Sequence, residues 1–289
     1  MFSVKFFLSL LLFSMILLFF SSTASAWGPA IHTVIACRII DEAGFNILPA
    51  ISSVIQSYPL EYIYGNMAAD FFIGRGQKKK KGHSHNWESG FSLLNESRSE
   101  REASYAYGFL SHLAADVIAH NYFVPLQLSR HSTLKKIGHI YSEVMADRFV
   151  GPFYMRIARD VLSINRLECD NLLRSAVTGS CYGLKAKRHI FTQTVKISEY
   201  LYCFPGISQN MQKSGDKTGH ESIVFMIGLS FRLVRDLLSN PEASPCLSHD
   251  PIGTRSIRNA GRKGFLSKVF RKKCGIEQGF TIDQRLLDI

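Results

Sequence analysis

Residues 100–120 read EREASYAYGFLSHLAADVIAH, and this segment has the clearest helical pattern in the chain. It predicts one long helix over residues 100–119 that ends near Asn121 and Pro125, because proline interrupts a helix interior. At 3.6 residues per turn, Asp116 and His120 are offset from His112 by about 40° and 80° around the helix axis. The three side chains should therefore project from one flank of the helix.

Helical patterns also dominate on both sides of this segment. They predict helices over residues 31–43, 49–58, 134–150, 153–163, 191–200 and 221–238, whereas alternating strand patterns are scarce. Irregular stretches rich in Gly, Ser, Pro or Lys separate these helices, and no internal repeat is visible. The sequence therefore predicts an all-α fold, a multi-helix bundle.

The composition of the 289 residues is that of a globular protein with a basic surplus. It is 46% hydrophobic and 20% charged, with a formal net charge of +11 and a pI near 9.4. This balance excludes intrinsic disorder, collagen-like repeats and a small disulfide scaffold. Only one segment is almost continuously apolar, which excludes a protein with several membrane spans. The surplus indicates an anionic partner such as phosphate, nucleic acid or an acidic membrane surface.

The first 26 residues have the pattern of a secretory signal peptide. Lys5 precedes an apolar run over residues 6–20, and Ala24 and Ala26 form an A-x-A cleavage site. The run falls short of the ~20 residues of a spanning helix, so we favour a cleaved leader over an uncleaved membrane anchor. The mature chain would then begin at Trp27 and be exported, to the periplasm or the extracellular space.

Six cysteines follow the leader. An even number in an exported protein permits up to three disulfides, and we interpret these cysteines as structural, with the pairing open. The absence of a C-x-x-C pair argues against a thiolate zinc site or a redox motif. The six are Cys37, Cys169, Cys181, Cys203, Cys246 and Cys274.

Two segments are unusually basic. Lys78, Lys79, Lys80 and Lys81 form a run in a glycine-containing loop, and residues 254–274 hold eight basic and no acidic residues. The tail is either a solvated segment or a contact for an anionic membrane surface, since apolar residues are interleaved with its charges.

Histidines and carboxylates repeat at helical spacing in the first half of the chain. His139 and Glu143 have the same i, i+4 spacing as His112 and Asp116, and Asp70 and the pair His83 and His85 lie nearby in sequence. Imidazoles and carboxylates presented by rigid helices are typical metal ligands. The alternative is a set of surface capping and salt-bridge residues. Apolar residues surround His112 and Asp116, and burying such groups without a cation would be costly.

These residues, together with Trp27, His32, GNMAAD over residues 65–70 and HNWESG over residues 85–90, resemble the zinc-dependent phospholipase C superfamily. This superfamily includes bacterial phospholipases C, fungal single-strand-specific zinc nucleases and the amino-terminal domain of glycosylphosphatidylinositol-specific phospholipase D. The resemblance covers residues 27–149 and implies the helical bundle of that superfamily.

The resemblance implies three zinc ions. The first would take Asp70, His85, His112 and Asp116. The second would share Asp116 and add His32 with the α-amine and carbonyl of Trp27, so that removal of the leader would complete the site. The third would take His120, His139 and Glu143.

Two ligand assignments have alternatives. The spacing from Asp116 to His120 is shorter than in the phospholipases C and nucleases and closer to the phospholipase D branch, and His131 is the substitute for His120. His83 is the substitute for His85, although the Glu-Ser-Gly that follows favours His85.

Such a centre suits phosphodiester hydrolysis, in which Asp70 would also orient or deprotonate the attacking water. The first choice is a phospholipase C that acts on phospholipid head groups. The alternatives are a zinc single-strand nuclease, in which aromatic side chains would stack on bases, and a non-catalytic metal-binding protein of the membrane surface. Aromatic residues near the ligands form either core or a substrate wall: Tyr64, Phe71, Phe72, Trp87, Tyr122 and Phe123.

The predicted organisation has four parts. Residues 1–26 are the signal peptide, 27–150 the metal-binding region, 151–253 further helices of the same domain, and 254–289 the basic tail. Beyond a phosphodiester substrate and an anionic membrane surface contacted through the Lys78 to Lys81 loop and the tail, the sequence indicates no obligate protein partner.

Overall fold

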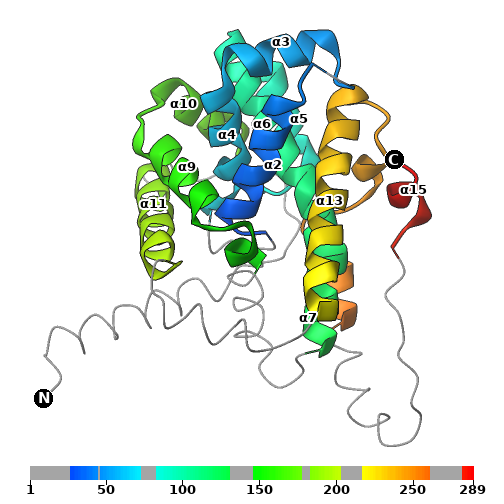
Figure 1. The fold of residues 1–289 in the computed structure, drawn as a ribbon. Coiled ribbons are helices and arrows are strands. Elements are labelled where there is room, and N and C mark those ends of the chain that lie inside the picture. The colour runs from blue at the N-terminus through cyan, green and yellow to red at the C-terminus, as the bar shows by residue number, and fades with distance from the viewer. Residues whose placement is uncertain are drawn as a thin grey trace, which may run out of the picture.

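The computed structural model describes residues 27–44, 46–72, 83–130, 146–177, 183–202, 217–260 and 282–289, and these residues form helices joined by turns, with no strand (Figure 1). The helices are α2 (Pro29–Asp41), α3 (Pro49–Ser57), α4 (Pro59–Ala68), η1 (Ala69–Phe72), α5 (Trp87–Glu96), α6 (Glu100–Ile118), η2 (Ala119–Phe123), α7 (Val124–Arg130), α9 (Pro152–Ser163), α10 (Leu167–Ala176), α11 (Gly183–Tyr202), α13 (Lys217–Ser239), η3 (Pro245–Ser248) and α15 (Gln284–Leu287). The predicted all-α fold is confirmed.

Helix α6 is the centre of this bundle. Helices α3, α4, α5 and α13 pack against it, and almost all of its residues from Ser104 onward are buried. It begins at a regular cap, because the Ser99 side chain accepts a hydrogen bond from the Glu102 amide at 3.2 Å. Two acidic residues in its first turn also interact favourably with the helix dipole.

Helices α4 and α6 meet backbone to backbone. A Cβ atom on Gly65 would lie 2.0 Å from the Tyr105 carbonyl oxygen, and one on Gly108 would lie 2.0 Å from the Tyr62 carbonyl oxygen. Only glycine permits this approach. The contact matters because the C-terminal end of α4 leads directly into η1, which carries Asp70.

Helix α2 is capped by a distant residue. The Asp147 carboxylate is buried and accepts hydrogen bonds from the amides of Ala30 at 3.2 Å and Ile31 at 3.1 Å. A Cβ atom on Gly28 would lie 2.2 Å from the same carboxylate. Helix α2 packs against α4, α9 and α13, so its first turn is fixed in the middle of the bundle.

The predicted helix over residues 100–119 is present as α6, which ends at Ile118 with Ala119 as its C-cap. The chain continues through the π-helical turn η2 into α7. Pro125 lies in the first turn of α7, where a missing amide N–H is tolerated. Helices α4, α5, α7, α10 and α15 were not predicted, and α11 is longer than the predicted segment over residues 191–200. Of the helix predicted over residues 134–150, only residues 146–150 are described, and they are helical.

The three described cysteines are free thiols, so the expected disulfides are not found among them. Cys37 is half-buried and has a pKa raised to about 11, and burial raises the pKa of Cys169 and Cys246 to about 12. Each lies in a helix and packs with apolar neighbours, which accounts for its presence as a small core residue. Cys181, Cys203 and Cys274 lie outside the described residues.

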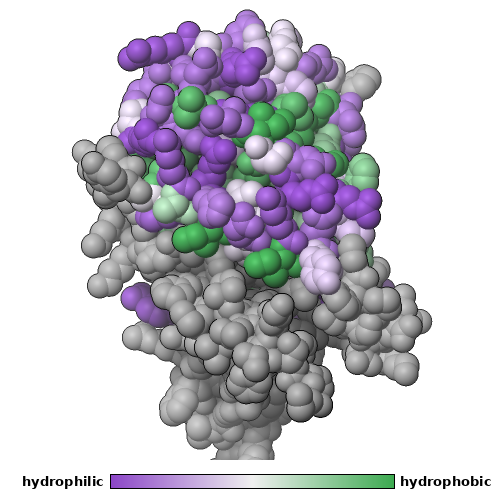
Figure 2. Space-filling model, turned by 90° about the vertical axis from the view of Figure 1, so that its left-hand side faces the viewer, coloured by the Kyte–Doolittle hydropathy of each residue, from purple (hydrophilic) through white to green (hydrophobic). Residues whose placement is uncertain are grey.

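The surface over α9, α10 and α11 is mostly hydrophilic, with apolar side chains scattered among the polar ones (Figure 2). None of the helices in the described part of the chain combines the length and apolar character needed to cross a bilayer. The predicted leader, the Lys78 to Lys81 loop and residues 261–281 of the tail lie outside the described residues.

Candidate metal centre

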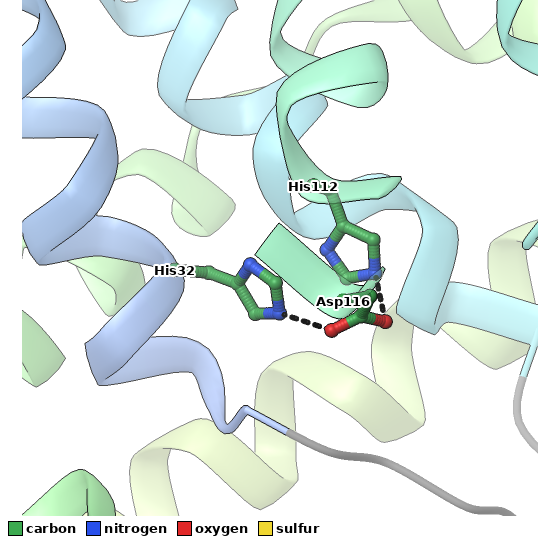
Figure 3. A group of neighbouring side chains, drawn as sticks. All are labelled: His32, His112 and Asp116. Carbon is green, nitrogen blue, oxygen red and sulfur yellow. Dashed lines mark ion pairs between the residues drawn. The ribbon is translucent and has the colours of Figure 1, made fainter. Parts of the chain in front are cut away.

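Four imidazoles surround the carboxylate of Asp116. Its Oδ2 atom lies 3.2 Å from His112 Nε2, 3.3 Å from His85 Nε2 and 3.4 Å from His120 Nε2, and its Oδ1 atom lies 3.4 Å from His32 Nε2. His112, Asp116 and His120 project from one flank of the chain, as expected from their spacing. Figure 3 shows the rings of His32, from α2, and His112, from α6, next to each other, each joined to a different oxygen of the Asp116 carboxylate.

Asp70 brings a second carboxylate to this cluster. Its Oδ1 atom lies 3.3 Å from His85 Nε2 and 3.8 Å from His112 Nε2. The 3-10 turn η1 places Asp70 at the end of α4, opposite α6. Among the described residues, two groups could each hold a metal ion, His32 with His112 and Asp116, and Asp70 with His85 and His112.

The backbone of α4 fixes the orientation of His112. Its Nδ1 atom donates a hydrogen bond to the carbonyl oxygen of Asn66 at 2.7 Å. In the neutral imidazole, Nε2 then has no proton and directs its lone pair at the carboxylates of Asp116 and Asp70. Metal-binding histidines in proteins are typically held in this way by a backbone carbonyl.

Several buried polar atoms of the cluster have no hydrogen-bond partner among the residues that the structure describes. Both ring nitrogens of His32 and the Oδ1 atom of Asp116 are in this state, and both side chains are almost fully buried. A buried polar group without a partner costs free energy, and a buried charge costs more. A cation between these atoms would satisfy them, so the donor set fits a metal ion. Imidazole nitrogen and carboxylate oxygen are ligands of zinc.

The electrostatics of the cluster favour positive charge. Burial alone would raise the pKa of Asp116, but His112 and His120 hold it well below its ordinary value. The pKa of Asp70 is lowered in the same way, chiefly by His112. Burial would lower the pKa of His85, yet the carboxylates of Asp116 and Asp70 raise it to about 10.

The pKa of His112 is shifted in the opposite direction to that of His85. Burial and the neighbouring His32 lower the pKa of His112, which favours its neutral imidazole. The rings of His32 and His112 stack with their centroids 4.0 Å apart. The Nε2 atom of His112 lies 3.1 Å from His85 Nε2 and faces the two carboxylates, which is an arrangement suited to a metal ligand.

The structure also distinguishes the two histidines of the predicted pair. The Nδ1 atom of His83 accepts a hydrogen bond from the His85 amide at 3.0 Å, and the His83 carbonyl accepts one from the Ser89 hydroxyl at 2.9 Å. His83 therefore shapes the loop, whereas His85 reaches the carboxylates. His131, His139 and Glu143 lie outside the described residues, so the predicted third zinc group is described only at His120.

Trp27 lies two residues before α2 begins at Pro29, and five residues before His32. Its side chain is fully buried, its indole N–H donates to the Ser230 hydroxyl at 3.0 Å, and its ring centroid lies 4.5 Å from that of Phe123. These contacts fix residue 27 beside the first turn of α2. The role of its amine and carbonyl as ligands stays a prediction.

The aromatic residues considered for a substrate wall have mainly packing roles. Tyr64, Phe71 and Phe123 are fully buried, and Tyr64 donates a hydrogen bond to Asp170 at 2.6 Å. Phe72 and Tyr122 are nearly buried. Trp87 is half-buried and donates its indole N–H to the His249 carbonyl at 2.9 Å.

Two supporting residues were not predicted. Asn66 orients His112 through its carbonyl, and Asp147 caps the helix that carries His32. Backbone carbonyls leave no trace in a sequence. Asp147 follows Glu143 at i, i+4 spacing in the sequence, and this spacing is the one feature that could have pointed to Asp147 as a residue of the centre.

One comparison with known proteins identifies a family. The family model described as zinc dependent phospholipase C matches residues 31–188, which is more than half of the chain. The match includes every described residue of the cluster, from His32 to His120. No curated protein and no solved structure matches the chain significantly.

Proposed function

Because this chain belongs to the zinc-dependent phospholipase C family, we propose that it is a secreted or periplasmic phospholipase C that hydrolyses the head-group phosphodiester of phospholipids. The observation that carries the proposal is the buried Asp116 carboxylate, with four imidazole nitrogens between 3.2 and 3.4 Å from its oxygens. Cations would satisfy the buried nitrogen and oxygen atoms that have no hydrogen-bond partner among the described residues, and a cluster of cations suits a phosphate ester.

Zinc bound by these residues would polarise the phosphate ester and lower the pKa of water in the site. The residues of the chain have separate tasks around it. His112, fixed by Asn66, and Asp116 are almost fully buried and would hold the ions. The Asp70 side chain is 10% exposed, against 2% for Asp116. Asp70 is therefore the carboxylate best placed to orient the attacking water and accept its proton.

Export belongs to the same proposal. Removal of the leader would free the α-amine of Trp27, a residue whose buried indole is held by Ser230 and which lies five residues before His32 in sequence. An α-amine has an ordinary pKa near 7.7–8.0, so a cation can displace its proton at neutral pH. Three zinc ions, as in the resemblance, would then occupy the completed site.

The basic segments support a phospholipid substrate. Lys78 to Lys81 lie in sequence between the proposed ligands Asp70 and His85, and the tail carries the second cluster of positive charge. Both would attract an anionic membrane surface toward the site.

The test uses protein that begins at Trp27, with zinc counted by elemental analysis. The protein is incubated in parallel with mixed phospholipid vesicles and with single-stranded DNA, and the release of phosphorylated head groups and of oligonucleotides is followed. We expect two or more zinc ions per chain, because two ligand groups are described, and release of head groups. Asp116→Asn should abolish this release, whereas the control Asp160→Asn, on an exposed side chain, should retain it.

Other outcomes would overturn the proposal. Cleavage of DNA without cleavage of lipid would make the protein a nuclease. Zinc binding without either activity would make it a non-catalytic metal-binding protein. Fewer than two zinc ions per chain would contradict the assigned ligands.

A further inference from the structure

A loop from the C-terminal third of the chain packs against the turn that carries His120. At Gly253 the backbone has φ of +63°, and a Cβ atom there would lie 2.4 Å from the carbonyl oxygen of His120 and 2.7 Å from its Cβ atom. Backbone therefore meets backbone at this point, and glycine is required both for the conformation and for the space.

The next residue of the same turn, Asn121, is held by the loop through its side chain. Its Nδ2 atom donates to the carbonyl oxygen of Asp250 at 2.9 Å and to that of Val117 at 3.0 Å. Its Oδ1 atom accepts a hydrogen bond from the Ser256 hydroxyl at 2.9 Å. Both polar atoms of the Asn121 side chain therefore have partners. Its Nδ2 atom is bonded to Val117 of its own helix and to Asp250, and its Oδ1 atom is bonded to Ser256.

The loop also holds the segment that carries His85. The indole N–H of Trp87, two residues after His85, donates to the carbonyl oxygen of His249 at 2.9 Å. His85 and His120 come from separate segments, and both approach the Oδ2 atom of Asp116. One loop therefore contacts the supports of two histidines on the same carboxylate.

The loop is itself well defined. The carboxylate of Asp250 accepts hydrogen bonds from the amides of Ile252 at 3.1 Å and Thr254 at 3.3 Å, and its carbonyl accepts one from Gly253 at 3.0 Å. Residues 251–253 are buried. A rigid, buried turn can fix the position of its neighbours, which an exposed loop cannot do.

We propose that residues 249–256, a turn followed by the first residues of a helix and here called the buttress loop, are a positioning element of the metal centre that holds His120 and His85 at the distances needed to share a cation with Asp116. The buttress loop lies beyond the family match, which ends at residue 188. The functional unit of this chain would therefore extend into its C-terminal third. The inference rests on the metal centre of the proposed function but not on its substrate.

The test compares two glycines with positive φ in the full chain without its leader. Gly253→Ala would force the loop away from His120, whereas Gly151→Ala, at φ of +87°, meets no atom within 4 Å. Zinc affinity is measured by competition with a chromophoric chelator, and the visible spectrum of the cobalt-substituted protein reports the ligand geometry. We expect Gly253→Ala to weaken zinc binding roughly 10- to 100-fold, as for other supports of metal ligands, and to change the cobalt spectrum. Gly151→Ala should bind as the unaltered protein does.

A second variant covers the case in which Gly253→Ala does not fold. Trp87→Phe keeps a ring at this position but removes the N–H that holds the loop, and we expect weaker zinc binding and an altered cobalt spectrum at unchanged helix content. Unaltered affinity and spectrum in both variants would overturn the proposal, as would an equal loss in Gly151→Ala. Zinc binding is read without substrate, so unaltered protein that binds zinc but cleaves no lipid would contradict the proposed function and leave this test intact.

Discussion

At the scale of single residues, the centre depends on atoms that do not bind metal. The carbonyl of Asn66 sets the tautomer of His112, and the carboxylate of Asp147 holds the first turn of α2. Both act on the position or protonation of a histidine that lies against Asp116. The ligand set therefore works only as part of a larger group of buried polar contacts.

Asp147 provides a test of this dependence. Asp147→Ala leaves the buried amides of Ala30 and Ile31 without their acceptor, and hydrogen bonds to a charged group are worth about 1.5–3 kcal/mol each. We expect a loss of free energy of unfolding in this range or above, measured by urea denaturation of the metal-free protein. Asp147→Asn should lose less, because it retains one oxygen acceptor.

The matched control for Asp147 is an exposed cap. Ser99→Ala removes the cap of α6, which should cost about 1 kcal/mol. If Asp147→Ala were no more destabilising than Ser99→Ala, the buried cap would have no special role in holding α2.

At the scale of helices, the crossing of α4 and α6 positions Asp70 against His112. Gly65→Ala would insert a methyl group 2.0 Å from the Tyr105 carbonyl oxygen, where the neighbour is backbone and cannot rotate away. We expect destabilisation by at least about 1–3 kcal/mol, as for overpacking of a core. The midpoint of urea unfolding measures it.

Replacing a different glycine by alanine should raise the free energy of unfolding instead of lowering it. Gly228 lies in α13, and a Cβ atom there meets nothing within 4 Å. Gly228→Ala should stabilise the protein by about 0.5–1 kcal/mol through helix propensity. If Gly65→Ala and Gly228→Ala both lowered the free energy of unfolding, the loss in Gly65→Ala could not be attributed to the close approach of α4 and α6.

The C-terminal turn allows a prediction about pH. Hydrogen bonds from the side chain and amide of Arg285 lower the pKa of Asp283 to about 2. A lowered pKa in the folded state stabilises the turn above the unfolded pKa of about 3.9, and this contribution is lost as the pH falls toward 2. Carboxyl titration by NMR should show the low pKa, and Arg285→Ala should return it toward 3.9. An unchanged pKa in Arg285→Ala would rule out this cause.

The same scale shows why part of the fold could be predicted from the sequence. Helix α6 was predicted because its pattern is long and His112, Asp116 and His120 share a flank. Helix α4 was missed because its residues from Glu61 to Ala68 are all buried, so it has no polar face to reveal a period. The end of α6 was predicted to within a residue, but the π turn η2 and helix α7, which continue the helical path past Asn121, were not predicted. The buttress loop has no ligand spacing, so only the structure relates it to His120.

At the scale of the whole molecule, zinc should contribute to stability, because the cluster joins α2, η1, α6, η2 and the loop before α5. Ligand at 100 times its Kd stabilises a protein by about 2.7 kcal/mol for each site. At about 2–4 °C per kcal/mol for a chain of this size, one zinc site corresponds to an increase in Tm of roughly 5–11 °C. We therefore expect a strong chelator to lower the Tm of protein that begins at Trp27 by at least this amount, and added zinc to restore it.

Two variants separate this effect from nonspecific binding of zinc. Asp116→Asn removes the carboxylate shared by His32, His85, His112 and His120, so its Tm should no longer respond to zinc or to the chelator. His189→Ala removes an exposed histidine of α11 and should keep the full response. Differential scanning calorimetry at fixed pH measures all three proteins. A Tm of the unaltered protein that is independent of zinc would show that the buried cluster does not bind the ion, because a ligand that binds only the folded state must raise its stability.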